Sequence, residues 1–322
     1  MKAIVQRGYG GVDVLEFSDV ERPQIGPEEV LVRVQAAGVD RGTWHLMAGL
    51  PYLVRLMFGL RGPKNPVPGL DVAGVVEDVG ERVTRFAPGD EVFGIAAGSF
   101  AEHARAREDK LVAKPAKVGF PEAATVGVSG LAALQAVRDH GQVRPGQRVL
   151  VLGASGGVGS FAVQLAKAHG AHVTGVCSTA KTDLVAGLGA DEVIDYTRDD
   201  VTDGRRRWDV VLDIGGNRPL RALRRALMPT GRLVIVGGEG GGKVVGGVDR
   251  QVRAMLLSPF VRQELGTFIS SENARDLEVL ADLVQSGRLS PAVDTTYALA
   301  DARAAVDHLS AGRARGKLAL TV

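Results

Sequence analysis

The residues that follow Leu152 have the types and the spacing of a turn that binds phosphate groups. A short apolar run leads into the sequence Gly153-Ala154-Ser155-Gly156-Gly157-Val158-Gly159. When such a turn joins a buried strand to a helix, free N–H groups and the positive end of the helix dipole favour a pyrophosphate. A glycine at 156 lets the backbone approach the phosphates, and one at 159 lets the helix pack closely on the strand. The segment therefore predicts a dinucleotide-binding site.

This turn departs from the strict pattern G-x-G-x-x-G, because Ala154 occupies the first glycine position. It reads G-x-x-G-x-x-G, with an additional glycine at 157. A glycine pattern by itself also fits a tight structural turn. The predicted order of strand, turn, helix and strand around this one favours the dinucleotide site.

The end of the next strand indicates which dinucleotide fits. A site for NAD usually has an Asp or Glu there, which accepts hydrogen bonds from the ribose hydroxyl groups. This chain has Cys177-Ser178-Thr179-Ala180-Lys181 instead. Two hydroxyl groups and an ammonium suit a 2′-phosphate, and the segment contains no carboxylate that would repel it. NADPH is therefore the predicted cofactor, with an exposed lysine on the following helix as the alternative interpretation of Lys181.

The elements that position these residues are predicted from the hydrophobic pattern. From about residue 121, strand-like and helix-like segments alternate, which is typical of a parallel sheet covered by helices. The predicted strands are 148–152, 172–177, 191–196, 209–213 and 232–236. The predicted helices are 159–169, which ends before Gly170, and 219–227.

The two ends of the chain have a different pattern. The first 120 residues hold short segments rich in Val and Ile between turn residues, with no long helical pattern, which predicts a mainly β domain. The strands predicted there are 1–6, 29–35 and 71–79. Beyond about residue 264 an amphipathic helix is predicted over 271–286. A last strand, 317–322, has no evident partner in the dinucleotide-binding part.

Composition excludes several classes of function. The chain has 322 residues, which favours two domains, and a net charge of +2, which requires no polyanionic partner. The basic run 205–207 is interpreted as a solvated loop rather than a contact to nucleic acid. The single cysteine, Cys177, cannot form a disulfide within the chain or a zinc site of several thiolates. No apolar run reaches the roughly 20 residues of a membrane span or forms a signal peptide, so a cytoplasmic protein is expected.

Taken in order, these segments resemble the medium-chain dehydrogenase/reductase superfamily, specifically its zinc-independent quinone oxidoreductase branch (the zeta-crystallin-like enzymes). The likeness covers essentially the whole chain. Besides the glycine turn, the segments that carry it are 27–34 (PEEVLVRV), 36–40 (AAGVD), 68–74 (PGLDVAG), 89–92 (GDEV), 98–102 (GSFAE), 195–196 (DY) and 314–317 (ARGK). One such motif would be weak evidence, whereas this many in the family's order are specific.

The resemblance implies an α/β protein with a GroES-like β-barrel domain and a Rossmann domain with a doubly wound parallel sheet. The GroES-like catalytic domain would comprise 1–120, completed by 265–322, and the Rossmann domain would comprise 121–264. The last strand would then find its partner in the first domain. The resemblance also implies a homodimer, and a substrate held in the cleft between the domains against the nicotinamide.

The resemblance also assigns residues to NADPH. Those expected at its pyrophosphate are Ser155, Gly156, Gly157 and Val158. Those expected around the adenosine 2′-phosphate are Cys177, Ser178, Lys181 and Tyr196. Those expected at the nicotinamide pocket are Gly237, Phe268 and Ile269, and the expected late cofactor contact is Lys317.

The expected reaction is transfer of a hydride from NADPH to a quinone or an α,β-unsaturated carbonyl compound. Zinc-dependent relatives have a Cys ligand at the position of Asp40, a Gly-His-Glu signature at 69–71 and a cysteine-rich lobe, all of which this chain lacks. His169 and His172 have H-x-x-H spacing but lie on either side of Gly170 at a predicted helix end, so no metal site is predicted. Reduction of an activated C=C bond needs no Lewis acid, because the conjugated carbonyl delocalises the incoming charge.

The proton donor is less well defined. Tyr52 matches an active-site tyrosine of some relatives, with a pocket-wall or surface tyrosine as the alternative. Asp40 replaces the asparagine usual in the family, and it would act as an acid only if burial raised its pKa. A structural hydrogen bond is the alternative for Asp40. Apolar residues of the segment after Tyr52 either cap a substrate site or pack in the core: Leu53, Val54, Leu56 and Phe58.

Three other interpretations of the sequence can be distinguished. A short-chain dehydrogenase needs a Tyr-x-x-x-Lys pair, and none of the four tyrosines has a lysine four residues later. A zinc alcohol dehydrogenase would lack its ligands. A non-catalytic NADPH-binding sensor or interaction protein would have the same glycine turn, and only turnover separates it from an enzyme.

Overall fold

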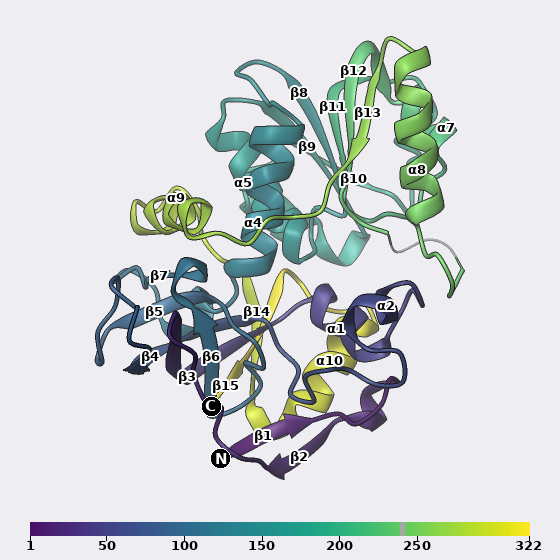
Figure 1. Ribbon diagram of the computed structural model, residues 1–322. Helices are drawn as coiled ribbons and strands as arrows, with labels where there is room; N and C mark the ends of the chain where they lie inside the picture. The colour runs from purple at the N-terminus through teal and green to yellow at the C-terminus, as the bar shows by residue number, and fades with distance from the viewer. Residues whose placement is uncertain (239–241) are drawn as a thin grey trace. The chain divides into compact units, whose positions relative to one another are not determined.

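The computed structural model describes residues 1–238 and 242–322, which form two compact units (Figure 1). The barrel unit comprises 1–131 and 272–322, and the parallel-sheet unit comprises 132–271. The parallel-sheet unit starts eleven residues later and ends seven residues later than the 121–264 expected from the sequence. One reason is that helix α4 (Gly127–Gln135) contributes residues to both units. The other is that strand β13 (Glu264–Thr267) still belongs to the parallel sheet.

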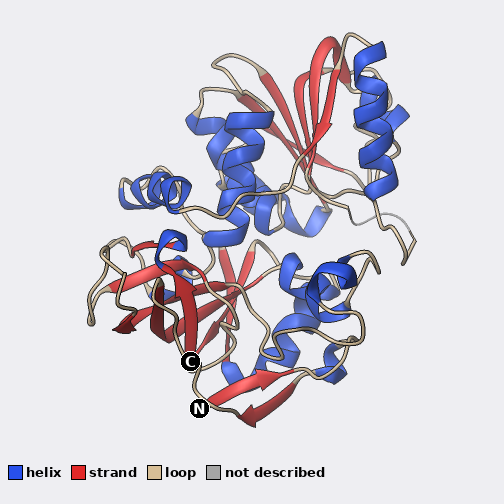
Figure 2. Ribbon diagram, in the orientation of Figure 1, coloured by secondary structure: helices blue, strands red, loops and turns tan. Residues whose placement is uncertain are grey.

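The parallel-sheet unit contains six parallel strands in the spatial order β10-β9-β8-β11-β12-β13 (Figure 2). Their bounds are β8 (Arg148–Leu152), β9 (His172–Cys177), β10 (Glu192–Asp195), β11 (Trp208–Asp213), β12 (Leu227–Ile235) and β13. The strand order reverses between β8 and β11, so a topological switch point lies at their carboxyl ends. The doubly wound sheet predicted from the sequence is therefore confirmed.

Helices cover this sheet with their apolar residues turned toward it. Their bounds are α5 (Gly157–Ala168), α6 (Thr182–Gly187), α7 (Leu220–Arg225) and α8 (Val248–Leu257). Figure 1 shows α5 and α8 on opposite sides of the sheet. Trp208, Val211 and Leu233 are fully buried in a core with Leu223 of α7 and Ala254 of α8. Burial of this apolar surface is the main stabilising contribution to the unit.

Two predictions in this unit, a helix and the strand that follows it, are wrong in their bounds. The helix expected over 219–227 ends at Arg225, and β12 begins at Leu227, five residues before the predicted strand. Leu227 is paired with Trp208 of β11 across an irregular register, and it is buried. The three exposed residues that follow it, 228–230, break the apolar run in the sequence and hide the true start of the strand.

The barrel unit is built on a seven-stranded sheet in the order β14-β15-β3-β4-β5-β7, with β6 paired to β3, and on a separate pair β1-β2. The bounds are β1 (Lys2–Val5), β2 (Glu16–Asp19), β3 (Glu29–Val39), β4 (Asp71–Val79), β5 (Glu91–Ile95), β6 (His103–Arg107), β7 (Leu111–Ala113), β14 (Val293–Ala298) and β15 (Lys317–Thr321). The last strand, β15, pairs antiparallel with β3, from Leu318 opposite Val39 to Thr321 opposite Ala36. The final strand therefore has its partner in the first part of the chain, as the family resemblance implied.

The barrel unit also contains helices. They are α1 (Arg41–Ala48), α2 (Val54–Phe58), α3 (Phe120–Ala123), α9 (Ala274–Gln285) and α10 (Ala302–Ser310). The sequence predicts no long helix in the first 120 residues, and the two helices there are short, with eight residues in α1 and five in α2. Only Thr43 and Met47 of α1 are buried, and α2 buries no residue, so neither helix has a pronounced apolar face.

The amphipathic helix predicted over 271–286 is α9, which starts at Ala274. Asn273 caps it, because its side chain accepts a hydrogen bond from Asp276 N at 2.9 Å. Among the described residues, no helix of the protein combines the length and the apolar character needed to cross a membrane.

Candidate cofactor site and substrate pocket

The glycine turn lies at the carboxyl end of β8, at the switch point of the sheet. Gly153 has a φ of +82°, a backbone conformation that residues other than glycine rarely adopt. The N–H groups of Gly153 and Ala154 both donate to the carbonyl oxygen of Val176 on β9, at 3.2 and 3.0 Å. The Ile214 N–H, after β11, donates to the oxygen of Leu152 at 3.1 Å. The turns that follow β8 and β11 are thus joined by hydrogen bonds.

Helix α5 starts directly after this turn with Gly156 as its N-cap. No side chain caps the helix, and the carbonyl of Gly156 accepts from Ser160 N at 2.9 Å. The N–H groups of the first helical residues, Gly157, Val158 and Gly159, have no acceptor within a helix. Together with the helix dipole, they form the kind of site that binds a phosphate group.

The two outer glycines of the helix start, Gly156 and Gly159, differ in whether the fold requires them. A Cβ atom on Gly159 would lie 2.0 Å from the carbonyl oxygen of Gly153, so the fold itself requires glycine there. A Cβ on Gly156 would meet only that oxygen, at 3.5 Å, which is ordinary contact, and its φ of −88° suits any residue. The fold does not require glycine at 156, and the open space beside it fits the close approach of a pyrophosphate.

Residues predicted around the 2′-phosphate gather at the carboxyl ends of β9 and β10. Asp195 is paired with Cys177 in the sheet, and Tyr196 N donates to the Cys177 oxygen at 3.1 Å. Tyr196 is more than half exposed, and Ser178 and Lys181 are partly exposed. The Cys177 side chain is buried, so only its backbone is available at this edge.

A carboxylate lies closer to this group than the sequence segment suggested. Asp195 accepts a hydrogen bond from the Thr179 hydroxyl at 2.6 Å and from the N–H of Thr197 at 2.9 Å. These hydrogen bonds, that of Thr179 above all, and the nearby Arg198 hold the pKa of Asp195 below its ordinary value, so it is ionised at neutral pH. Segment 177–181 contains no acidic residue, but β10 places one beside it.

The residues predicted at the nicotinamide follow β12 and β13. Gly237 N donates to the Asp213 oxygen at 3.2 Å, and a Cβ at 237 would lie 2.0 Å from Ile214 O. The ring of Phe268 stacks on that of His140 with 4.2 Å between centroids. Ile269 is almost fully exposed. All the predicted cofactor residues of this unit therefore lie at or just beyond the carboxyl ends of its parallel strands, where such folds bind ligands.

A buried ion pair that the sequence did not predict holds this edge together. Arg250 of α8 pairs with Asp213 at the end of β11, and both side chains are largely buried. Arg250 also donates to the oxygen of Gly237 at 3.1 Å, and Asp213 accepts from Gly216 N at 3.2 Å. No sequence signal links two residues this far apart, because α8 is joined to β11 only through the fold.

The barrel unit positions Asp40 and Tyr52 on either side of α1. Asp40 is buried and caps α1, accepting hydrogen bonds from Thr43 N at 2.9 Å and from the Thr43 hydroxyl at 3.1 Å. Both carboxylate oxygens of Asp40 accept hydrogen bonds, which agrees with the alternative prediction that this residue forms a structural hydrogen bond. Tyr52 is 43% exposed, and the Arg55 guanidinium lies 4.5 Å from the centroid of its ring and 4.6 Å from that of Tyr9.

A mostly apolar cavity of about 220 Å³ lies in the same unit. Its lining includes Gln6, Thr43, Leu46, Met47, Phe58 and Val67. Of the apolar residues predicted to cap a substrate site, Phe58 lines it, whereas Leu53 and Leu56 are exposed elsewhere. Core packing is therefore excluded for Leu53, Leu56 and Phe58, which are all exposed by more than a third.

Lys317 lies inside the barrel unit. Its ammonium donates to Asp71 Oδ2 at 3.3 Å and to the Ser129 hydroxyl at 3.0 Å, and Asp71 Oδ1 accepts from Val128 N at 2.6 Å. Burial raises the pKa of Asp71, against the opposing charge of Lys317. This arrangement gives Lys317 a structural role and does not support the predicted late cofactor contact, because its ammonium is buried among these partners.

The described residues contain no group of three or more His, Cys, Asp or Glu side chains arranged to hold a metal ion. His169 ends α5, and its Nδ1 lies 2.8 Å from the oxygen of Leu165.

Comparison with known proteins agrees with this architecture. A model of the alcohol dehydrogenase GroES-like domain matches residues 26–116, and a model described as a zinc-binding dehydrogenase matches 188–320. The quinone oxidoreductase of Pseudomonas aeruginosa is 34% identical over 334 residues, which cover 99% of each chain. The chain belongs to the medium-chain dehydrogenase/reductase superfamily, in its quinone oxidoreductase branch.

Two further members of the family bear on the site. The chloroplastic NADPH-dependent alkenal/one oxidoreductase of Arabidopsis thaliana is 33% identical, over 99% of this chain and 78% of its own. The structure of Escherichia coli quinone oxidoreductase complexed with NADPH has a TM-score of 0.85 and 25% identity, and covers the whole of both chains.

Proposed function

We propose that this protein is an NADPH-dependent oxidoreductase that transfers a hydride to a quinone or an α,β-unsaturated carbonyl compound. The observation that carries the proposal is the glycine turn at the switch point of the doubly wound sheet, with open space at Gly156 and free N–H groups at the start of α5. The names of the relatives, quinone oxidoreductase and NADPH-dependent alkenal/one oxidoreductase, support the class of acceptor.

The residues of the parallel-sheet unit would hold the cofactor by its charged groups. The N–H groups of Gly157 and Val158 would donate to the pyrophosphate. The adenosine 2′-phosphate would be held by Ser178, Lys181 and Tyr196. The nicotinamide, which supplies the hydride when the cofactor is bound, would lie near Gly237, Phe268 and Ile269.

Preference for NADPH over NADH is the part of this proposal that rests on Lys181. Replacing it by glutamine removes one charge-assisted hydrogen bond, so we expect the NADPH dissociation constant to rise about tenfold. The NADH dissociation constant should stay within about twofold. Equal losses for both nucleotides would place Lys181 away from the 2′-phosphate.

Residues of the barrel unit would line the binding site of the hydride acceptor. The apolar cavity beside Phe58 suits the ring of a quinone or the chain of an enone, because burial of apolar surface drives such binding. An enone that gains a hydride at its β-carbon becomes an enolate, which then takes up one proton. We propose Tyr52 as the donor of that proton. Asp40 acts through Thr43 and α1, so we assign it a positioning role.

We also propose that the reaction proceeds without zinc and that the protein is a cytoplasmic homodimer. Leu70 stands where zinc-dependent relatives have a histidine, and an aliphatic side chain cannot bind a metal. Activity that persists after dialysis against a chelator would support zinc independence. Light scattering from the purified protein tests the dimer, which a monomer mass would exclude.

Isotope transfer tests the proposed chemistry directly. NADPH carrying deuterium at both hydrogen positions of nicotinamide C4 is incubated with the protein and an enone, and the product is examined by NMR. We expect deuterium at the β-carbon and a solvent-derived proton at the α-carbon. Reduced product without deuterium at the β-carbon, under conditions where the cofactor is consumed, would exclude direct hydride transfer. The variant Tyr52→Phe should slow proton delivery while leaving NADPH binding unchanged.

A further inference from the structure

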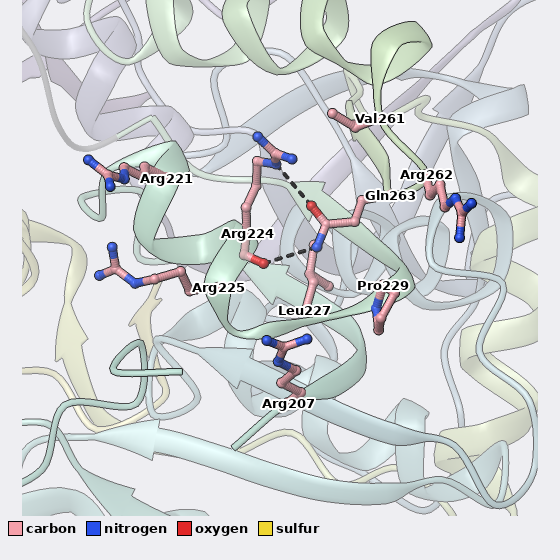
Figure 3. Close-up of a pocket in the computed structure, with 9 residues that line it drawn as sticks. All are labelled: Arg207, Arg221, Arg224, Arg225, Leu227, Pro229, Val261, Arg262 and Gln263. Atoms are coloured by element: carbon pink, nitrogen blue, oxygen red, sulfur yellow. Dashed lines mark hydrogen bonds between the residues drawn. The ribbon is translucent and has the colours of Figure 1, made fainter. Parts of the chain in front are cut away.

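A second cavity, of about 430 Å³, lies in the parallel-sheet unit and is lined mainly by arginines (Figure 3). Its lining consists of Arg207, Arg221, Arg224, Arg225, Leu227, Pro229, Val261, Arg262 and Gln263. Figure 3 shows Arg207, Arg224 and Arg225 on different sides of Leu227. Five positive charges around one cavity produce a local positive potential, which attracts an anion.

This cavity is separate from the glycine turn. Arg207 directly precedes β11, Leu227 is the first residue of β12, and Gln263 directly precedes β13. The glycine turn follows the carboxyl end of β8. Because all these strands are parallel, the arginine cavity lies at the amino ends of the strands and the glycine turn lies at their carboxyl ends.

The charges in the cavity are not neutralised within the described part of the chain. None of its five arginines forms an ion pair with a described residue. Several other arginines of the unit are paired: Arg206 binds Glu192, Arg218 binds Asp200, and Arg232 binds Glu264. The cavity thus concentrates guanidinium groups without the carboxylates that pair with several other arginines of this unit.

Two of these arginines form hydrogen bonds to the protein through their Nε atoms. Arg224 Nε donates to Gln263 Oε1 at 2.9 Å, and Gln263 Nε2 returns a bond to the Arg224 carbonyl at 3.0 Å. Arg225 Nε donates to the oxygen of Thr202 at 3.2 Å. The Nη groups of both side chains donate to no described residue. Their positions are therefore fixed while their terminal donors stay available, which lowers the entropy lost on binding.

We propose that this cavity is a binding site for a compact anion with several phosphate groups. Guanidinium forks match phosphate oxygens with two parallel hydrogen bonds, and the bond is charge-assisted. A hollow formed by side chains of several segments suits a small oligophosphate, which can reach several arginines at once. The site is distinct from that of the cofactor and would be occupied at the same time.

Calorimetric titration with inorganic tripolyphosphate at low ionic strength tests the site. The test variant is Arg221→Gln with Arg262→Gln, because neither side chain has a hydrogen-bond partner among the described residues, so the fold should be unaffected. The matched control is Arg144→Gln, an exposed arginine of the same unit outside the cavity. Saturating the protein with NADPH beforehand keeps the probe from the glycine turn.

We expect one tripolyphosphate per chain, with affinity that falls as sodium chloride is added. The double variant should weaken binding by about tenfold or more, and the control by less than about twofold. Inorganic monophosphate should bind more weakly than tripolyphosphate. Absence of binding to the unmodified protein, or equal binding by both variants, would overturn the proposal. NADPH is titrated into the cofactor-free protein in parallel. A failure of cofactor binding would therefore be distinguished from a failure of the arginine cavity to bind the anion.

Discussion

The carbonyl oxygen of Gly153 lies where a Cβ atom on Gly159 would have to be, at a distance of only 2.0 Å. The start of α5 can therefore pack against the turn only if residue 159 is a glycine. Gly156, three residues earlier in the same turn, is under no such constraint. The glycine turn thus combines one residue that the fold requires with one that only a ligand would require.

Alanine substitutions separate these two roles. We expect Gly156→Ala to fold normally but to raise the NADPH dissociation constant by about tenfold or more, because its methyl group occupies the space for the pyrophosphate. Gly159→Ala should instead lower the free energy of unfolding by about 3 kcal/mol or more through steric overlap. Urea denaturation and nucleotide fluorescence titration measure both. Unchanged NADPH affinity in a folded Gly156→Ala protein would place the cofactor elsewhere.

The thiol of Cys177 should be unreactive in the folded protein. Its side chain is buried at the end of β9, and burial, with a smaller effect of Asp195, raises its pKa to about 11. Only about one thiol in a thousand is then ionised at about pH 8, and the thiolate is the reactive form. We expect negligible labelling by a disulfide reagent at that pH and complete labelling in urea. Rapid labelling of the native protein would show that this strand end opens.

The buried pair of Lys317 and Asp71 should make stability depend on pH once it is broken. Lys317→Met removes the charge that opposes the effect of burial, so the pKa of Asp71 rises further. A carboxyl whose pKa is raised by folding stabilises fully only below its unfolded pKa, and loses that contribution as the pH increases. Burial already raises the pKa of Asp71 to about 7 in the wild type, so the two proteins differ only above that pH. The variant should thus be close to the wild type at about pH 5 and less stable by about 1 kcal/mol at about pH 8.

Two further variants control this prediction. Lys110→Met breaks a pair with Glu272 whose side chains are each one-third exposed, and should cost under about 1 kcal/mol at either pH. Adding Asp71→Asn to Lys317→Met should restore most of the stability at high pH. A Lys317→Met protein whose free energy of unfolding does not change with pH relative to wild type would contradict the assignment.

Phe58 should influence the choice of acceptor. Its side chain lines the apolar cavity of the barrel unit, so Phe58→Ala should raise KM for long-chain enones more than for small quinones, by about tenfold. Leu56→Ala is the matched control, because Leu56 lies on the same helix but is exposed outside the cavity. Identical effects of the two substitutions on every acceptor would remove the cavity from the substrate site.

Much of this architecture could be predicted from the sequence. The strand around Leu150 is a continuous apolar run because both faces of a parallel sheet are buried, and the glycines mark the turn that follows it. These local signals locate the edge of the sheet at which we propose that the cofactor binds. The order of the motifs then identified the family and the partner of the last strand.

The residues that sequence could not place are those whose role depends on distant partners. Asp213 and Arg250 meet only through the fold, as do Asp71 and Lys317. The carboxylate of Asp195 comes beside Thr179 through the pairing of β10 with β9, and not through its position in the chain. The arginine cavity is lined by side chains from three segments of the chain. Of its arginines, only Arg207 belongs to a basic run that is evident in the sequence.

Steady-state oxidation of NADPH by the purified protein tests the central claim most directly. The nicotinamide absorbance is followed with a panel of quinones and enones, with NADH in place of NADPH and with a chelator as controls. We predict turnover that resists the chelator, prefers NADPH to NADH and is lost in Gly156→Ala. Tight binding of NADPH without oxidation on any acceptor would contradict a reductase and favour a non-catalytic sensor, and failure to bind either nucleotide would contradict both.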